Sequence, residues 1–206
     1  MKGLFITVEG TDGAGKSTQI QLLTDYLKSK GRNVILKREP GGTEISEKIR
    51  ELILDVNNKE MSDVAEALLY AASRAQLVQQ VIKPALVKGE VVICDRFVDS
   101  SIVYQGIARG LGKNMVEEIN RFAIDGIMPD ITLFFDLSPE IGIKRKMQDQ
   151  KLDRMESEKL DFHLRVYEGY KTLTNMYSDR IRRIDANMTI EEVHKQVLDA
   201  IKDFIK

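Results

Sequence analysis

Cysteine is nearly absent from the sequence, which contains Cys94 alone. A single cysteine excludes an internal disulfide and a zinc site built from several thiolates. Cys94 lies within an apolar run, so we expect a buried structural thiol rather than a nucleophile. The chain therefore suits a reducing compartment, and we expect a cytoplasmic protein.

Long apolar runs are also missing. No run approaches the ~20 apolar residues that a membrane-spanning helix needs, and the charged Glu9 comes too early for a signal-peptide core. The formal net charge of −1 argues against wrapping duplex nucleic acid through bulk charge. We expect neither a membrane nor a nucleic-acid partner.

Residues 10–17 match the phosphate-binding pattern G-x-x-x-x-G-K-[ST], between an apolar run and a stretch typical of a helix. Small residues let successive N–H groups curl around anionic oxygens, and the dipole of the following helix favours negative charge. A glycine-rich turn that matches by chance is the alternative, but the context favours a nucleoside triphosphate with Mg²⁺. Lys16 would reach the terminal phosphates and Ser17 would place its hydroxyl on the metal. The predicted cofactor-binding residues here are Gly10, Thr11, Asp12, Gly13, Ala14, Gly15, Lys16, Ser17 and Thr18.

Five short apolar runs recur between helical stretches. Their lack of strict alternation is typical of strands buried on both faces of a parallel sheet. We therefore predict an α/β fold of the P-loop NTPase class over residues 1–206, as one domain with a five-stranded parallel sheet between two layers of helices. The expected strands are Leu4–Glu9, Asn33–Arg38, Glu90–Asp95, Ile131–Leu137 and Ile181–Ala186, and three of the expected helices are Lys16–Lys30, Ser62–Leu86 and Thr189–Lys206.

The stretch Ser62–Leu86 is apolar on nearly all sides of a helix. Such a helix is buried either against a second copy of the chain or as a central helix of one subunit. Periodicity alone leaves both alternatives open.

A basic run follows the fourth expected strand. A solvated helix face usually explains such a run, but a short basic lid at about residues 142–156 is an equal alternative in a phosphate-binding protein. The run contains Lys144, Arg145, Lys146, Lys151 and Arg154.

The third apolar run ends in Asp95 and Arg96. An aspartate at the carboxyl end of a parallel strand lies where ligands bind, and it can hold Mg²⁺. Arg96 stands where many ATP-driven machines have a water-activating glutamate, and a guanidinium cannot be a base. Because it can instead grip a second phosphate bidentately, the pair favours phosphoryl transfer over hydrolysis. The alternative, a surface ion pair, is disfavoured because neighbouring strand residues point to opposite faces.

The segment Arg38–Thr43 follows the second expected strand and reads R-E-P-G-G-T. Proline and paired glycine favour a tight turn, and Thr43 suits the start of a helix. Glu39 falls at the ligand edge of the sheet, so a binding role and an ordinary loop are both open.

The motifs, taken in order, resemble those of bacterial thymidylate kinases. The first motif is shared by many families, but the combination is specific and covers essentially the whole chain. The matching segments are Glu9–Thr18, Arg38–Thr43, Leu68–Gln76, Asp95–Phe97, Ser100–Ser101, Tyr104–Gly106 and Leu152–Arg154.

The resemblance implies in-line phosphoryl transfer from Mg-ATP to dTMP, which yields dTDP for dTTP supply, by a homodimer. It implies that Tyr70 stacks on thymine, that Arg74 and Gln105 hydrogen-bond the base, and that Ser101 lines its other edge. Tyr104 would crowd the 2′ position of the sugar. Without the resemblance, the sequence favours core positions for both Tyr70 and Tyr104. The guanidinium of Arg74, by contrast, lies on an apolar helix and requires buried partners.

The resemblance also assigns the charged residues. Arg96 and Arg50 would hold the acceptor phosphate, Asp12 would meet the sugar 3′-hydroxyl, and Glu39 would lie near the acceptor and the metal. The predicted catalytic residues are Lys16, Asp95, Arg96, Arg145 and Arg154; the metal ligands are Ser17 and Asp95; and Arg182 or Arg183 would border adenine.

The sequence departs from some relatives at Gly13, where they carry an arginine. Lid arginines replace it in other bacterial members, yet here Met147 and Asp149 occupy lid positions where arginine is common. Arg145 or Arg154 is therefore the expected cation for the transferring phosphoryl group.

Three rival functions remain open at this stage. A kinase for another acceptor is disfavoured only by Tyr104 and Gln105. A GTP-dependent switch would need Asn-Lys-x-Asp, but the string from Asn58 to Met61 lacks the aspartate. Arg96 disfavours an ATPase motor. His163 and His194 have no companion ligands, and we expect both at the surface.

Overall fold

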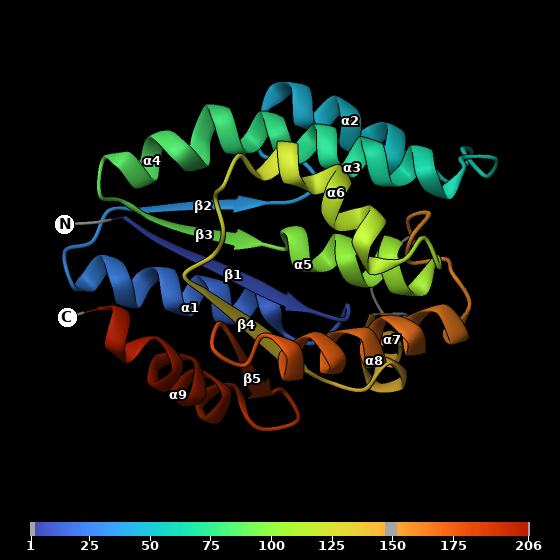
Figure 1. The fold of residues 1–206 in the computed structure, drawn as a ribbon. Helices are drawn as coiled ribbons and strands as arrows, with labels where there is room; N and C mark the ends of the chain where they lie inside the picture. Colours follow the sequence, from blue (N-terminus) through green and yellow to red (C-terminus); the bar gives the residue numbers. More distant parts are fainter. Residues whose placement is uncertain (1–2, 147–151, 206) are drawn as a thin grey trace.

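The computed structural model describes residues 3–146 and 152–205. Its centre is a five-stranded sheet in the order β2-β3-β1-β4-β5, and every neighbouring pair is parallel. Helices cover both faces (Figure 1), so the predicted three-layer α/β fold is confirmed. The strands are β1 (Leu4–Gly10), β2 (Val34–Arg38), β3 (Val91–Asp95), β4 (Ile131–Asp136) and β5 (Ile181–Asp185), each within one residue of its predicted bounds.

One face of the sheet is covered by α1 (Lys16–Ser29) and α9 (Ile190–Ile201), which lie side by side in Figure 1. Alternate residues of β1, such as Ile6 and Val8, pack here against Leu23 and Val197. The predicted closing helix ends earlier than expected, since a short 3-10 turn, η3 (Lys202–Phe204), follows α9. At its other end, Thr189 and Glu192 form a capping box.

The opposite face is covered by most of the remaining helices. Phe5 and Phe134 point to this side and pack with Leu77, Phe97 and Tyr170. The helices that cover it include α3 (Asp63–Leu77), α4 (Lys83–Val87), α5 (Val98–Ser101), α6 (Lys113–Ile124) and α8 (Leu160–Met176). Cys94 is buried in this layer, as expected of a structural thiol.

The long apolar helix packs against other helices of the subunit on part of its surface, while Val64, Leu68 and Val87 on it remain exposed. It runs as α3, a π segment η1 (Val78–Ile82) and α4, and α3 packs against both α2 (Glu44–Leu54) and α6. Pro84 has no N–H for the carbonyl of Gln80, and the helix widens into the π turn just before it. Thr43 caps α2 as predicted, because its side chain accepts a hydrogen bond from the Ser46 N–H.

The lid segment is described in part. Helix α7 (Pro139–Lys146) and residues 152–156 belong to the described structure, whereas Met147, Asp149 and Lys151 lie outside it. A second π segment, η2 (Ile102–Ala108), continues α5 toward the lid side of the molecule. Within these ranges, no helix is long and apolar enough to cross a membrane.

Candidate active site

The phosphate loop (residues 10–18) joins β1 to α1 at the carboxyl edge of the sheet. Its glycines adopt positive φ angles, with 138° at Gly10, 77° at Gly13 and 80° at Gly15. These conformations strain any residue with a Cβ, which explains the glycine spacing. No side chain caps α1, so its first N–H groups remain available to an anion.

The Lys16 side chain is buried against the phosphate loop. Its Nζ donates to the carbonyl oxygens of Gly10 (3.1 Å) and Thr11 (2.9 Å) and lies 3.9 Å from an Asp12 carboxylate oxygen. Burial lowers the pKa of Lys16, and the charge of Arg96 lowers it further. A phosphate beside Lys16 would supply the negative charge that favours its protonated form.

The phosphate loop borders an opening that we call the phosphate opening. Asp95 Oδ1 is buried there and has no hydrogen-bond partner among the described atoms, while Ser17 is exposed. A hard cation prefers such oxygen donors, so the two side chains fit the predicted Mg²⁺ site. The opening is lined by residues 12–18, Asp95, Arg96 and Arg145.

Arg96 has an unusual backbone. Its φ is +68°, a left-handed conformation that is rare for a side-chain-bearing residue and is typical of functional positions. Its N–H donates to the carbonyl oxygen of Val8, which ties the residue to β1. The guanidinium then pairs with Asp12 at 2.8 Å and lies over the Tyr104 ring at 5.2 Å. In the described structure Arg96 makes no ion pair with Asp95, as the sequence argument predicted.

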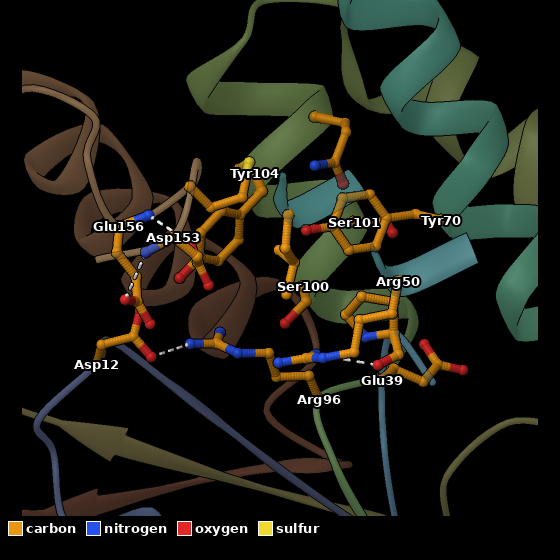
Figure 2. A pocket seen from close by; sticks show the side chains of 14 residues that line it. Asp12, Glu39, Arg50, Tyr70, Arg96, Ser100, Ser101, Tyr104, Asp153 and Glu156 are labelled. Atoms are coloured by element: carbon orange, nitrogen blue, oxygen red, sulfur yellow. Dashed lines mark hydrogen bonds and ion pairs between the residues drawn. The ribbon is translucent and has the colours of Figure 1, made fainter. Parts of the chain in front are cut away.

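A second hollow, the side cavity, meets the phosphate opening at Asp12 and Arg96, which line both. Figure 2 shows Tyr70, Tyr104 and Ser101 around this cavity with Asp12 and Arg96 at its lower edge. The structure thus brings most of the predicted substrate-binding residues together around one cavity. The cavity is lined by Asp12, Glu39, Pro40, Arg50, Leu54, Tyr70, Arg96, Ser100, Ser101, Tyr104, Gln105, Asp153, Met155 and Glu156.

Arg74 does not line either hollow. It is 1% exposed and lies behind the side cavity, where its partners include Glu39, Ser101 and the Phe97 carbonyl oxygen. The expectation that a buried guanidinium requires partners is therefore confirmed. Burial raises the pKa of Glu39 to about 7, although the charge of Arg74 opposes this.

The two lid arginines occupy different places. Arg145 lines the phosphate opening, and its Nη1 lies 3.4 Å from the Gly13 carbonyl oxygen. Arg154 instead donates to Glu66 Oε2 (2.7 Å) and to the Ile53 carbonyl oxygen (2.7 Å). Only Arg145 of the pair lies at the predicted phosphate site.

Gly13 has a second role beyond its φ angle. A Cβ on Gly13 would lie 2.3 Å from the Gly142 carbonyl oxygen, and a Cβ on Gly142 would lie 2.2 Å from the Asp12 carbonyl oxygen. The phosphate loop and α7 therefore touch backbone to backbone. An arginine at position 13 is sterically incompatible with this arrangement.

Four other predicted positions have different outcomes. Arg182 and Arg183 on β5 line neither hollow: Arg182 bonds the Ser178 carbonyl oxygen and Arg183 pairs with Asp136. His163 was expected at the surface, but this expectation is wrong: it is 9% exposed, because α8 turns it into the protein beside Phe162. His194 is half-buried and bonds Gln19.

Sequence reasoning missed a buried carboxylate beside the site. Glu9 is fully buried and accepts hydrogen bonds from the Phe97 N–H (2.8 Å), Ser100 Oγ (2.6 Å) and the Tyr170 hydroxyl (2.8 Å). The signal was present, since a charged residue interrupts an apolar strand at its ligand end. Ser100, Asp153 and Glu156 were also missed, and they carry no comparable signal.

The stability of the protein is expected to depend on pH through Glu9. Burial, and then the charge of Asp99, raise the pKa of Glu9 to about 7 from 4.5. Between these two values the folded protein holds a proton that the unfolded chain releases, so this contribution to the free energy of unfolding falls as pH rises. The fall is on the order of 3 kcal/mol.

Urea unfolding from pH 4 to 8 tests this expectation. Glu9→Gln should remove the contribution, so wild type loses stability relative to the variant as pH rises through this window. Glu191→Gln, at an exposed position on α9, is the control and should keep the wild-type profile. Parallel profiles for wild type and Glu9→Gln would contradict the assignment.

The chain is similar to known proteins over most of its length. Residues 8–197 match the family model described as thymidylate kinase. A thymidylate kinase of Exiguobacterium sp. is 50% identical over 97% of this chain and 94% of its own length, and one of Caldanaerobacter subterraneus subsp. tengcongensis is 49% identical over 100% and 98%. The crystal structure of thymidylate kinase from Ehrlichia chaffeensis superposes with a TM-score of 0.79 at 32% identity, covering 98% of this chain and 99% of that one. The chain belongs to the thymidylate kinase family.

Proposed function

We propose that the protein transfers the γ-phosphoryl group of ATP to the phosphate of dTMP, with ATP in the phosphate opening and dTMP in the side cavity. One observation carries this proposal: the two hollows share Asp12 and Arg96, so two anions bound in them would lie side by side. A hydrolase needs one such site and a base for water, and Arg96 cannot be that base.

The donor side uses the phosphate loop. Its N–H groups and Lys16 bind the β- and γ-phosphates, while Ser17 and Asp95 are the residues that would hold Mg²⁺. When bound, the ion neutralises charge on the phosphate oxygens. Asp95 Oδ1, which is buried and lacks a hydrogen-bond partner among the described atoms, supports this role.

The acceptor side uses the side cavity. Tyr70 offers a ring face to the thymine base, and Tyr104 fills the space that a 2′-hydroxyl would need. Arg96 and Arg50 bind the acceptor phosphate, and Arg50 is preorganised by a 3.0 Å hydrogen bond to the Pro40 carbonyl oxygen. Asp12, held by Arg96, faces the sugar 3′-hydroxyl.

The reaction needs positioning more than proton transfer. A phosphate oxygen of dTMP is already anionic, so it attacks in line without a strong general base. Lys16, Arg96 and Arg145 surround the meeting point of the two hollows and stabilise charge as the phosphoryl group moves.

Arg145→Ala is expected to lower kcat by ~10³-fold with little change in KM for dTMP. Among the described lid side chains, Arg145 reaches the phosphate loop, and a guanidinium that stabilises the transition state of phosphoryl transfer is worth about 10³–10⁵ in rate. Steady-state kinetics with Lys144→Ala as the neighbouring control measures the effect. A kcat within tenfold of wild type would exclude Arg145 from this role.

Product analysis tests the proposed reaction. Purified protein incubated with Mg-ATP and dTMP should form dTDP and ADP in equal amounts, as measured by anion-exchange chromatography. ADP that accumulates without dTDP would contradict the transfer mechanism.

The proposal includes a homodimer in the cytoplasm. Several large apolar side chains remain exposed although α3 packs against α2 and α6, among them Leu68 on α3 (52% exposed) and Phe122 on α6 (76% exposed). A second copy of the chain would cover such residues. Light scattering after size-exclusion chromatography should give twice the 23.4 kDa chain mass.

A further inference from the structure

Glu66 is a buried carboxylate that no step of the proposed mechanism uses. It lies on α3, is 1% exposed, and receives hydrogen bonds from three side chains. Gln105 Nε2 (2.9 Å) and, at a longer distance, Arg109 Nε (3.3 Å) donate to Oε1, while Arg109 Nη2 (3.1 Å) and Arg154 Nη2 (2.7 Å) donate to Oε2. Glu66 therefore connects the base-binding residue Gln105 to the end of the lid at Arg154.

The charge state of Glu66 is set by these neighbours. Burial alone would raise its pKa, but the hydrogen bonds from Arg109 and Gln105, with that from Arg154, outweigh burial and lower it. An ionised carboxylate can only accept hydrogen bonds. Consequently the Gln105 NH₂ group, and not its oxygen, must face Glu66.

This constraint leaves Gln105 Oε1 for the side cavity. Gln105 lines that cavity, and no described group donates a hydrogen bond to its Oε1. The amide therefore presents an acceptor to a bound base.

Ser101 supplies the complementary group. Its Oγ accepts a hydrogen bond from Arg74 Nη1 at 3.0 Å, and a guanidinium never accepts, so the Ser101 hydroxyl hydrogen is free to donate into the cavity. One acceptor and one donor match the N3–H and C4 carbonyl of thymine. Cytosine offers the reverse pattern, an N3 acceptor and an N4 amino donor.

We propose that Glu66 is a positioning residue that sets the base specificity of the enzyme by fixing the orientation of the Gln105 amide. Arg109 and Arg154 hold Glu66 in place from the other side. The inference rests on the proposed binding of dTMP in the side cavity, and it adds the physical origin of the discrimination against dCMP.

The variant Glu66→Gln separates this role from simple structural support. Two guanidinium N–H groups, from Arg109 and Arg154, face the Oε2 position, whereas only the longer Arg109 Nε contact faces the Oε1 position. The oxygen of the new amide therefore takes the Oε2 position, and its NH₂ group turns toward Gln105. Gln105 must then rotate to accept, and it presents NH₂ to the base. We expect kcat/KM for dTMP and for dUMP to fall together, and the ratio of kcat/KM for dTMP to that for dCMP to fall by about 10-fold or more.

The matched control is Asp63→Asn. Asp63 pairs with Arg109 at 3.4 Å and, within the described structure, makes no hydrogen bond to Gln105, so the variant perturbs the same cluster without turning the amide. It should keep the wild-type base preference. The KM for ATP should remain unchanged in both variants, because Glu66 lies on the acceptor side.

The outcomes are distinct. A wild-type enzyme that does not phosphorylate dTMP would overturn the proposed function itself. A wild type active on dTMP, with a folded Glu66→Gln that keeps the dTMP to dCMP ratio, would overturn only the role of Glu66. If Glu66→Gln does not fold, as judged by its thermal melt, Glu66→Asp withdraws the carboxylate from Gln105 but keeps its charge, and an unchanged ratio there would equally overturn the inference.

Discussion

Replacing Arg96 by alanine is expected to reduce kcat/KM for dTMP by ~10³-fold while the protein remains folded. Arg96 lines both hollows and pairs with Asp12, so its loss removes the cation at the point where the two phosphates meet. Removing one group that stabilises a developing charge costs about 10²–10³ in rate, and Arg96 additionally binds the ground-state acceptor. Steady-state kinetics with varied dTMP should show a raised KM as well as a lowered kcat.

Two further variants define what Arg96 contributes. Arg96→Lys keeps the charge but loses the bidentate geometry, so it should recover only part of the activity. Arg121→Ala removes an exposed arginine of α6 and should behave as wild type. An Arg96→Ala enzyme with turnover close to wild type would show that the acceptor phosphate binds elsewhere.

Lys16→Met is expected to lower kcat by ~10³-fold without destabilising the fold. The ammonium group is buried and its pKa is lowered by that burial, so folding carries a desolvation cost that a thioether avoids. Methionine has a similar length and can occupy the same space. We therefore expect a melting temperature equal to or above that of wild type, together with a loss of turnover.

Calorimetric melting and initial rates on the same sample test both parts of this prediction. Lys48→Met, at an exposed position on α2, is the control for the substitution itself. If the Lys16→Met protein melts well below wild type, its inactivity results from a loss of folding. Full activity would remove Lys16 from the phosphate site.

The fold was predictable because its signals are local. Each strand is a short apolar run, and the glycine spacing of the phosphate loop indicates the first β-α junction. The alternation of strands and helices then leaves a parallel sheet as the consistent arrangement. The capping of α2 by Thr43 followed from the same kind of local rule.

The interior of the site was less predictable because its contacts join distant parts of the chain. Glu9 and Tyr170 are hydrogen-bonded but lie 161 residues apart, and Glu66 meets Arg154 across 88 residues. Arg74 was expected to need buried partners, but the sequence around Arg74 does not indicate that Glu39 and Ser101 are those partners. His163 shows the opposite failure, since a polar residue without ligand companions was assigned to the surface although its helix face is buried.

Acceptor-dependent release of ADP distinguishes phosphoryl transfer to dTMP from hydrolysis of ATP. The protein is incubated with Mg-ATP alone and then with dTMP, dUMP, dCMP, dGMP or dAMP in turn, and ADP is measured in a coupled assay. We expect a low rate with ATP alone and a large increase with dTMP, because Arg96 joins a donor site to an acceptor site and a guanidinium cannot act as the base for water. An equal rate of ADP release with and without dTMP would contradict it.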